Sequence, residues 1–243
     1  VEAVGRAGLD LNRLSEEATA LQNCEKQVAI LYSQPSRIYT KEYIADLFRT
    51  YEGVLFSGNR PHFITEKQIH RLSEFKVLLV PGVTHTEPQV LEEVKTFQNN
   101  GGIVILIDSD KTVLKRNKYN QVTESQIVEE IYHNAVWTEG GSIGVSPDAE
   151  ASERISQLVN QHTNHEFTVK SSEGSYYIEY TETVCNGRKI LNIMNHNSKE
   201  NRKVQVFRHG VIQEKMTDII SGTVIGPEIE LYPYKPVLLE FSE

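Results

Sequence analysis

The apolar positions of this chain follow one period in its first half and another in its second. In the first half, apolar runs of strand length stand at 27–32, 76–80 and 102–107. Such continuous runs are typical of strands that are buried on both faces of a parallel sheet. After about His162 apolar and polar residues alternate, beginning at 176–183, as in strands with one exposed face. The pattern therefore predicts an α/β part followed by an all-β part.

Segments with helical spacing lie between the apolar runs. Residues 87–100 and 41–56 each place their apolar residues on one helical face, and in 41–56 these are Ile44, Leu47, Phe48 and Tyr51. A further strand at 61–64 and helices at 123–133 and 147–160 complete the series. We therefore predict an open, doubly wound, mainly parallel sheet of the flavodoxin or amidotransferase type.

A helix is predicted at 3–22, before the first strand, because its apolar residues recur every three or four positions. It fits a connector from an upstream domain or a cover for its own sheet, and the sequence leaves both open. In the second half, Asn186-Gly187 predicts a hairpin turn, and short strands follow at 189–194, 203–208, 210–214, 222–225 and 228–241. We expect an α/β domain over 1–160, including helix 3–22, and an antiparallel β-sandwich domain over 161–243.

Composition argues against several classes of partner. The net charge is −8 and the basic residues are scattered, so nucleic acid is not expected. No apolar run reaches the roughly 18 residues of a membrane span, so we expect a soluble chain without a membrane partner. The two cysteines, Cys24 and Cys185, are placed in different predicted domains, and neither a disulfide framework nor a zinc site is expected. A reducing, cytoplasmic location fits that usage.

Candidate chemistry is sought in the loops at 33–37, 82–87 and 108–111, because open α/β sheets bind ligands beyond the carboxyl ends of their strands. Three residues there are candidates for ligand or interface roles: His85, beside a helix start, and Asp108 and Asp110, at the end of a buried strand. Paired carboxylates suit a cation or acid–base work. Each of the three is more commonly a capping or solvated turn residue.

The patterns of common catalytic centres are missing. No cysteine stands at a glycine-flanked strand-to-helix turn, and neither G-x-S-x-G nor a phosphate-binding glycine loop occurs. His162 and His165 have only Glu166 beside them, which is too little for a zinc site. We therefore predict no catalytic residue, no cofactor and no metal. An amidotransferase-like hydrolase remains an alternative, and it would depend on Cys24.

Five tyrosines raise a third possibility, a carbohydrate-binding module, because sugar rings pack on exposed aromatic faces. They are Tyr176, Tyr177, Tyr180, Tyr232 and Tyr234. Strand alternation places Tyr176 and Tyr180 on one face and Tyr177 on the other. We expect most of these rings to fill the sandwich core.

Two segments resemble a known family: QVAILYSQPSRIY at 27–39 and EFKVLLVPGVTHTEPQVLEEVKTFQNNGGIVILID at 74–108. They look like the trimerisation domain of glycoside hydrolase family 42 β-galactosidases, and MTDIISGTVIGPEIELYPYKPVLLEF at 216–241 resembles the closing β domain of these enzymes. The resemblance implies a class I glutamine amidotransferase-like fold that has lost its catalytic cysteine. The leading helix, with Arg6-Ala7-Gly8, is similar to the segment that leaves the catalytic (β/α)₈ barrel.

The resemblance implies a non-catalytic accessory and oligomerisation region of a larger glycosidase. Its expected partners are copies of itself, in a homotrimer, and the upstream barrel of the same polypeptide. The family's two catalytic glutamates belong to that barrel, so no catalytic residue is carried over to this chain. The polar insert at 111–121 is longer than the family's connection and leaves the trimer contacts open.

Overall fold

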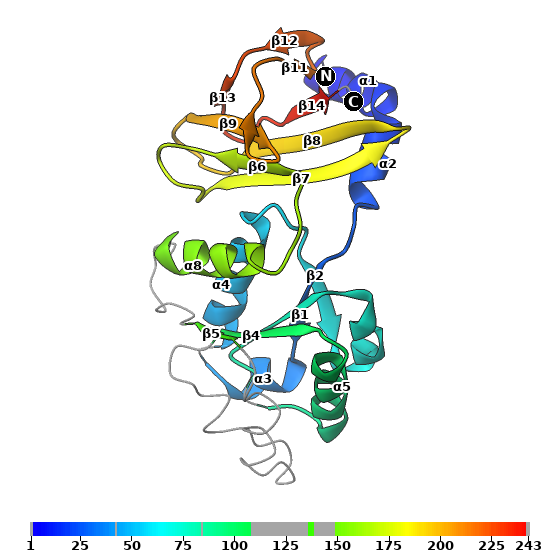
Figure 1. Cartoon of the computed structure of the whole chain (residues 1–243), viewed down its shortest axis with the longest axis vertical. Coiled ribbons are helices and arrows are strands. Elements are labelled where there is room, and N and C mark those ends of the chain that lie inside the picture. The colour runs from blue at the N-terminus through cyan, green and yellow to red at the C-terminus, as the bar shows by residue number, and fades with distance from the viewer. Residues whose placement is uncertain (1, 42, 84, 108–135, 139–148, 242–243) are drawn as a thin grey trace. The chain divides into compact units, whose positions relative to one another are not determined.

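The computed structural model describes residues 2–41, 43–83, 85–107, 136–138 and 149–241, which form two compact units (Figure 1). Lys26–Asn164 form the first, the α/β unit. The second, the β unit, joins Val1–Glu25 to His165–Glu243. The leading helix, assigned above to the α/β domain, thus groups with the β unit. The predicted helix 123–133 and the insert 111–121 lie outside the described residues.

The α/β unit is built on a five-stranded sheet in the order β2-β1-β3-β4-β5, with every neighbouring pair parallel. This is the flavodoxin-like order, in which the strand sequence reverses between β1 and β3. The strands are β1 Val28–Tyr32, β2 His62–Thr65, β3 Val77–Pro81, β4 Ile103–Ile107 and β5 Val136–Thr138. The predicted parallel sheet is confirmed.

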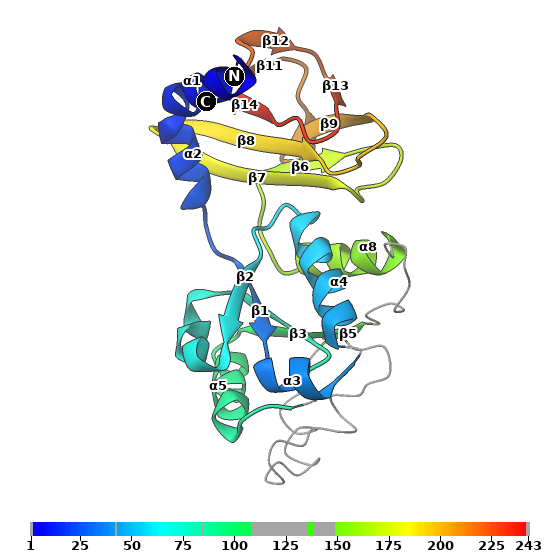
Figure 2. The ribbon, with the colours of Figure 1, turned by 180° about the vertical axis from the view of Figure 1, so that it is seen from behind.

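Helices cover both faces of this sheet (Figure 2). Along β1, Ala29 and Leu31 point to one core and Val28 and Ile30 to the other, as strand alternation requires. The first core is closed by η1 and α5, and the second by α4 and α8. The helices are α3 Gln34–Tyr39, α4 Tyr43–Leu55, the 3₁₀ helix η1 Glu66–Glu74, α5 Pro88–Asn99 and α8 Ala149–Asn160. The fold is doubly wound, as predicted.

Helix α4 turns three of the four residues of its predicted apolar face outward, whereas the fourth, Leu47, packs against the cores. Its exposed side carries Ile44, Phe48 and Tyr51, and the Phe48 side chain is 62% exposed. Its buried side combines the apolar Tyr43 and Val54 with the polar Asp46, Arg49 and Thr50. That side is held by close packing on α8, where a Cβ added to Gly53 would lie 2.5 Å from Ile155 Cγ2. Close packing on α8 and the burial of Tyr43 and Val54 together fix the orientation of α4.

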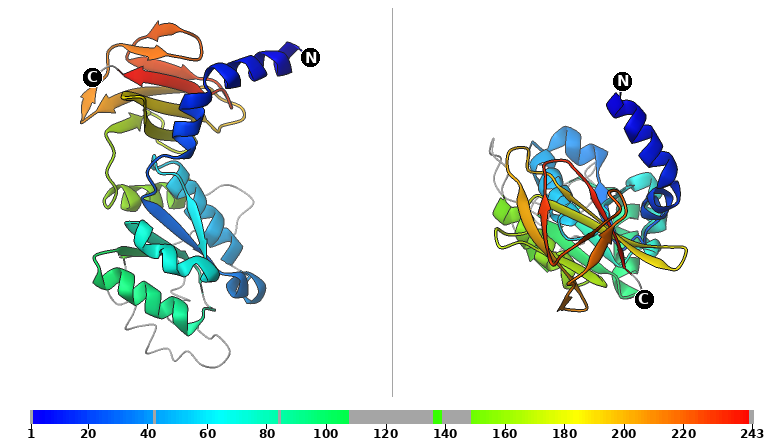
Figure 3. Two further views of the ribbon diagram at one scale, coloured as in Figure 1. Left: turned by 90° about the vertical axis from the view of Figure 1, so that its right-hand side faces the viewer. Right: turned by 90° about the horizontal axis from the view of Figure 1, so that it is seen from above.

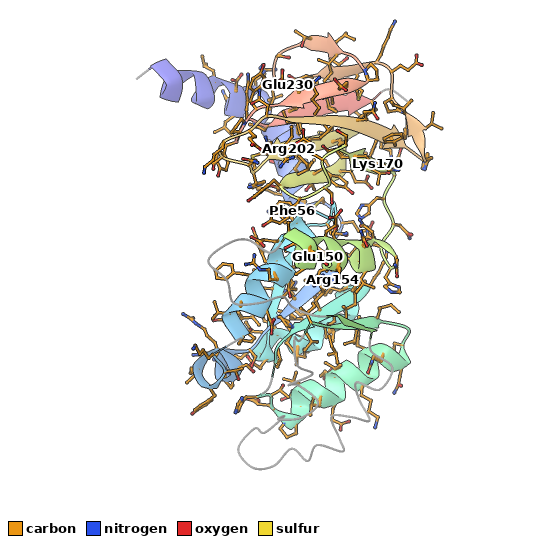
Figure 4. All side chains as sticks on the ribbon, turned by 90° about the vertical axis from the view of Figure 1, so that its left-hand side faces the viewer. Phe56, Glu150, Arg154, Lys170, Arg202 and Glu230 are labelled. Atoms are coloured by element: carbon orange, nitrogen blue, oxygen red, sulfur yellow. The ribbon has the colours of Figure 1, made fainter. Side chains whose placement is uncertain are left out.

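Helix α8 has the opposite character on its outer side. Arg154 donates to Glu150 at 3.0 Å across one helical turn, in a solvated ion pair (Figure 4). Its apolar residues Ile155 and Val159 are fully buried against the sheet. An amphipathic helix of a globular domain is normally arranged in this way. The outward apolar face of α4 is therefore a departure within its own unit.

The β unit consists of two antiparallel sheets whose inner faces share one core. One sheet has the order β12-β11-β14-β8-β7, and in the other β9 pairs with β6, β10 and β13. The strands are β6 Phe167–Lys170, β7 Ile178–Cys185, β8 Arg188–Asn195, β9 Arg202–Arg208, β10 Val211–Ile212, β11 Met216–Asp218, β12 Thr223–Ile225, β13 Glu228–Leu231 and β14 Val237–Phe241. The predicted antiparallel sandwich is confirmed.

The predicted hairpin turn joins β7 to β8. Asn186 and Gly187 have φ values of +51° and +80°, the left-handed pair that a type I′ turn requires. The turn sets the register, so that Ile178 at the start of β7 faces Asn195 at the end of β8. The sequence pattern did not indicate β5, β6 or β11, which have only three or four residues each.

The single predicted leading helix is two helices, α1 Glu2–Arg13 and α2 Ser15–Gln22, which meet at Leu14 (Figure 3). Leu14, Ala20 and Leu21 pack on an apolar cluster of the outer sheet face that includes Cys185 and Ile190. Helix α2 therefore covers the β unit's sheet, which is why it groups with that unit. Among the described residues, no helix is long and apolar enough to cross a bilayer.

Candidate functional site

The point where the strand order reverses, beyond the carboxyl ends of β1 and β3, is the first place to look for a ligand. Here Ser33 Oγ donates to the backbone carbonyl of His85 at 2.8 Å. Ser36 Oγ donates to the same carbonyl and accepts from the His85 backbone N–H, each at 3.0 Å. Ser33 Oγ also accepts from Ser36 N, which caps α3. The polar groups of the two loops therefore bind each other.

Two residues of α4, Tyr43 and Asp46, pack against the same loops. The buried Tyr43 hydroxyl accepts from the backbone N–H of Ser33 at 2.8 Å, and burial raises the pKa of Tyr43 well above its ordinary value. Gly82, after β3, has φ +48°, and a Cβ there would lie 2.6 Å from Asp46 Oδ2. Only glycine fits this loop without strain. Among the described residues, the reversal point is therefore a packed junction of the loops after β1 and β3 with α4.

His85 is the one predicted site residue that the structure locates. It is partly buried, and its ring lies 5.2 Å from that of Tyr39. Burial lowers the pKa of His85, so the imidazole is neutral at pH 7. The neighbouring serine hydroxyls donate to its backbone carbonyl, which does not prepare either serine as a nucleophile. The other two candidates, Asp108 and Asp110, lie outside the described residues.

Both cysteines belong to the β unit, so their predicted placement in different domains is wrong. The reason is that the segment up to Glu25, which contains Cys24 and helix α2, belongs to the β unit. Cys24 and Cys185 are buried, and neither forms a disulfide. Cys185 ends β7 beneath α2. Neither thiol lies in the α/β unit, where an amidotransferase-like nucleophile would stand.

A cavity of about 510 Å³ lies beside the amino ends of β3 and β4. Its walls include Phe75 and Phe97, and its polar groups include His70, Lys76 and His162. Lys76 Nζ donates to Gln27 Oε1 at 3.1 Å. The volume suits a small molecule, but the cavity opens at the end of the sheet opposite to the usual ligand side. The period of the apolar residues does not indicate such a cavity, because residues of η1, α5, β4 and the segments before β3 and β4 line it together.

The two histidines with metal-like spacing are divided between the units. His162 lines the cavity of the α/β unit, whereas His165 begins the second segment of the β unit, with Nδ1 4.0 Å from a Glu182 carboxylate oxygen. Among the described residues, no group of three or more His, Cys, Asp or Glu side chains is placed to hold a metal ion.

The five tyrosines do not fill the sandwich core as expected. Tyr180 is buried there, but Tyr176 and Tyr177 are only partly buried, and Tyr232 and Tyr234 are exposed. The expectation rested on regular alternation. Tyr177 and Tyr234 have φ values of +72° and +55°, which interrupt the alternation at both places. The exposed rings therefore belong to chain turns and not to regular strands.

Together the two units define a class of protein: a doubly wound sheet with a packed reversal point, joined to an antiparallel sandwich. This fold occurs in solved glycoside hydrolases. An exo-carrageenase GH42 from Bacteroides ovatus matches with a TM-score of 0.69 and 19% identity, over 95% of this chain and 31% of that one. Gan42B, a GH42 β-galactosidase from G. stearothermophilus, matches with a TM-score of 0.61 and 16% identity, over 90% of this chain and 40% of that one.

A β-galactosidase from Bacillus circulans sp. alkalophilus matches similarly, with a TM-score of 0.59 and 15% identity, over 90% of this chain and 42% of that one. The chain thus spans less than half of the length of each of these proteins. The resemblance noted in the sequence is confirmed as a likeness of fold to part of GH42 glycosidases. No protein-family model and no curated protein matches the sequence.

Proposed function

We propose that this chain is a non-catalytic accessory region of a larger glycosidase of the β-galactosidase type, with the hydrolytic barrel elsewhere in the same polypeptide. The observation that supports it is the fold match, which takes in about nine-tenths of this chain and about two-fifths of the GH42 β-galactosidases. The packed reversal point and the position of both thiols in the β unit agree with a region that holds and assembles a catalytic domain.

We assign self-association to the α/β unit. Four exposed residues would form the contact, and we call them the α4 patch: Ile44, Phe48, Tyr51 and Phe63. The first three lie at i, i+4 and i+7, on one face of α4. Phe63 lies on β2, the edge strand, and its ring stacks on that of Tyr51 with centroids 6.1 Å apart and an interplanar angle of 4°.

On α3, which contacts α4, Ile38 and Tyr39 are also exposed. A contiguous apolar surface of this kind marks an interaction site in a soluble domain. The edge strand beside it has unpaired backbone groups that a second chain can meet. A second copy of this chain is the occupant that we propose. Closed rotational symmetry limits the assembly, and the resemblance to a trimerisation domain implies three copies.

Light scattering on the chain tests this assembly. We expect a mass three times the 27.6 kDa of one chain. Phe48→Glu places a charge in the α4 patch and should return the mass toward 27.6 kDa. Val211→Glu is the matched control, because Val211 is 65% exposed but lies on a β-unit hairpin. A wild-type monomer at high concentration, or equal dissociation of both variants, would overturn the assignment.

Hydrolysis of an aryl β-galactoside tests the glycosidase parent. The polypeptide from the complete reading frame should cleave it, and this chain alone should not. Cleavage by the chain alone would contradict the proposal, and its sensitivity to Cys24→Ser would then show whether the amidotransferase-like alternative applies.

A further inference from the structure

Within the described part of the β unit, the two ends of the sheet that contains β7 and β8 have different surroundings. Helix α2 covers the end at Cys185 and Ile190. At the opposite end, the strand register brings the start of β7 to the end of β8, where Ile178 faces Asn195. His196 continues the chain there, and its backbone N–H donates to the Tyr177 carbonyl at 2.8 Å. Tyr177, Glu179, His196 and Tyr234 define what we call the aromatic end.

Two tyrosines at the aromatic end have left-handed backbones. Of the four non-glycine residues with positive φ in the described chain, Asn186 and His209 each precede a glycine in a hairpin turn, which accounts for them. Tyr177 and Tyr234 have no such glycine, and a bulky residue in this region is strained. Both are hydrogen-bonded to the dipeptide Asn195-His196. The Tyr177 carbonyl accepts from His196 N, and Tyr234 N donates to the Asn195 carbonyl, each at 2.8 Å. Strain of this kind gathers at ligand-binding sites.

The fully buried Asn195 holds the strained segments in place. Its Nδ2 donates to the carbonyl of Glu200 at 2.9 Å and to that of Leu231 at 3.2 Å. Its Oδ1 accepts from Asn197 N at 2.8 Å, and its backbone bridges to Pro233. One side chain thus ties the end of β8 to two loops. A site on such a rigid base loses little entropy when a ligand binds.

The side chains at the aromatic end combine a ring with adjacent polar atoms. Tyr234 is 58% exposed, and its ring stands edge-to-face with that of His196, with centroids 6.2 Å apart. His196 Nε2 and Glu179 Oε2 lie 2.5 Å apart. The Tyr176 ring lies 4.2 Å from that of Tyr177. An aromatic surface beside a carboxylate and an imidazole suits a pyranose, whose C–H face packs on the ring while its hydroxyls meet the polar pair.

We propose that the aromatic end binds a neutral sugar residue, independently of any catalytic site. The choice of a galactose-containing oligosaccharide rests on the proposed glycosidase parent, whereas the site itself rests on the geometry above. The net charge of −8 and the carboxylate of Glu179 disfavour a phosphate or nucleic acid at this place.

Titration of the full chain with galactose, lactose and galacto-oligosaccharides, followed by NMR shifts, tests the site. We expect binding near the millimolar range, with shifts at His196. Tyr234→Gly should weaken binding about tenfold or more, yet leave the melting temperature unchanged or higher, because glycine relieves the left-handed strain. A tyrosine with only a structural role would give the opposite result, a lower melting temperature.

Tyr232→Ala is the matched control. Tyr232 is exposed on the same loop, but its ring lies beneath Lys235 Nζ, and its hydroxyl is 3.3 Å from a Glu230 carboxylate oxygen. Binding should survive this change and weaken in Glu179→Gln. Absence of shifts with every sugar, or equal loss in Tyr232→Ala, would overturn the inference. Either result leaves the light-scattering and hydrolysis tests of the proposed function unaffected. Failure of the sugar site can therefore be distinguished from failure of the proposed function.

Discussion

The docking of α2 on the β unit can be tested through one ion pair. Glu17 of α2 has a side chain only 8% exposed, and it accepts from Arg188 Nη2 at 2.6 Å. Arg188 also donates to Glu240 at 2.9 Å, so one guanidinium joins α2 to β8 and β14. Replacement of Glu17 by glutamine removes the charge while it keeps the shape.

We expect Glu17→Gln to cost about 1–2 kcal/mol. Exposed ion pairs contribute about 0–1 kcal/mol, and loss of one partner of a fully buried pair costs about 3–5 kcal/mol. The pair lies between these limits, because the Arg188 side chain is 37% exposed and keeps Glu240. For a unit of about 100 residues this corresponds to a drop in melting temperature of about 5–10 °C.

The pH dependence of this difference has a definite sign. Burial acts to raise the pKa of Glu17, but hydrogen bonds from its own backbone N–H and from Arg188 outweigh burial and lower the pKa below its ordinary 4.5. A lowered folded-state pKa adds stability that is complete above the unfolded value and is lost as pH falls through the folded value. The difference in the free energy of unfolding between wild type and Glu17→Gln should therefore disappear at acidic pH.

Two probes separate the units in this experiment. The only tryptophan, Trp137, lies on β5, so its emission reports unfolding of the α/β unit. Hydrogen exchange of peptides from α2 and β8 reports the β unit. In Glu17→Gln, protection should fall in α2 and β8 while the tryptophan transition stays in place. Glu16→Gln, at an exposed neighbour that accepts from Asn186, is the control. Equal effects of both variants, or a shift confined to Trp137, would refute the docking of α2.

Two further variants test packing and charge within each unit. Gly53→Ala should destabilise the α/β unit by about 1–2 kcal/mol, because the new methyl group overlaps Ile155. The Trp137 emission should then report unfolding at a lower denaturant concentration. An unchanged midpoint would mean that α4 and α8 are not in such close contact. Glu166→Gln should cost the β unit about 1–3 kcal/mol at neutral pH, because its carboxylate accepts from Lys189 and Arg208 at 2.5 and 2.7 Å. Burial acts to raise the pKa of Glu166, but these bonds lower it below its ordinary 4.5. The loss should therefore shrink in urea titrations as the pH falls below 4.5 through the folded-state pKa, and a loss independent of pH would contradict this reasoning.

The period of the apolar residues determined both fold classes. Continuous runs such as 76–80 fit strands that two helical layers cover, and β3 is buried along its whole length. The alternation from 178 onward fits a strand of a sandwich, and Asn186-Gly187 set the hairpin and its register. These features follow from local sequence, because strand and helix periods and turn conformations depend on near neighbours.

The tertiary structure alone decided which surfaces those elements present. The helical spacing of Ile44, Leu47, Phe48 and Tyr51 predicts one apolar face, but only Leu47 packs against the cores, and the close packing of α4 on α8 leaves the other three exposed. Likewise, the sequence left helix 3–22 with two possible roles, and the apolar cluster at Cys185 and Ile190 placed it on the β unit. A pattern determines that an apolar face will be formed, whereas its burial depends on partners that lie far away along the chain.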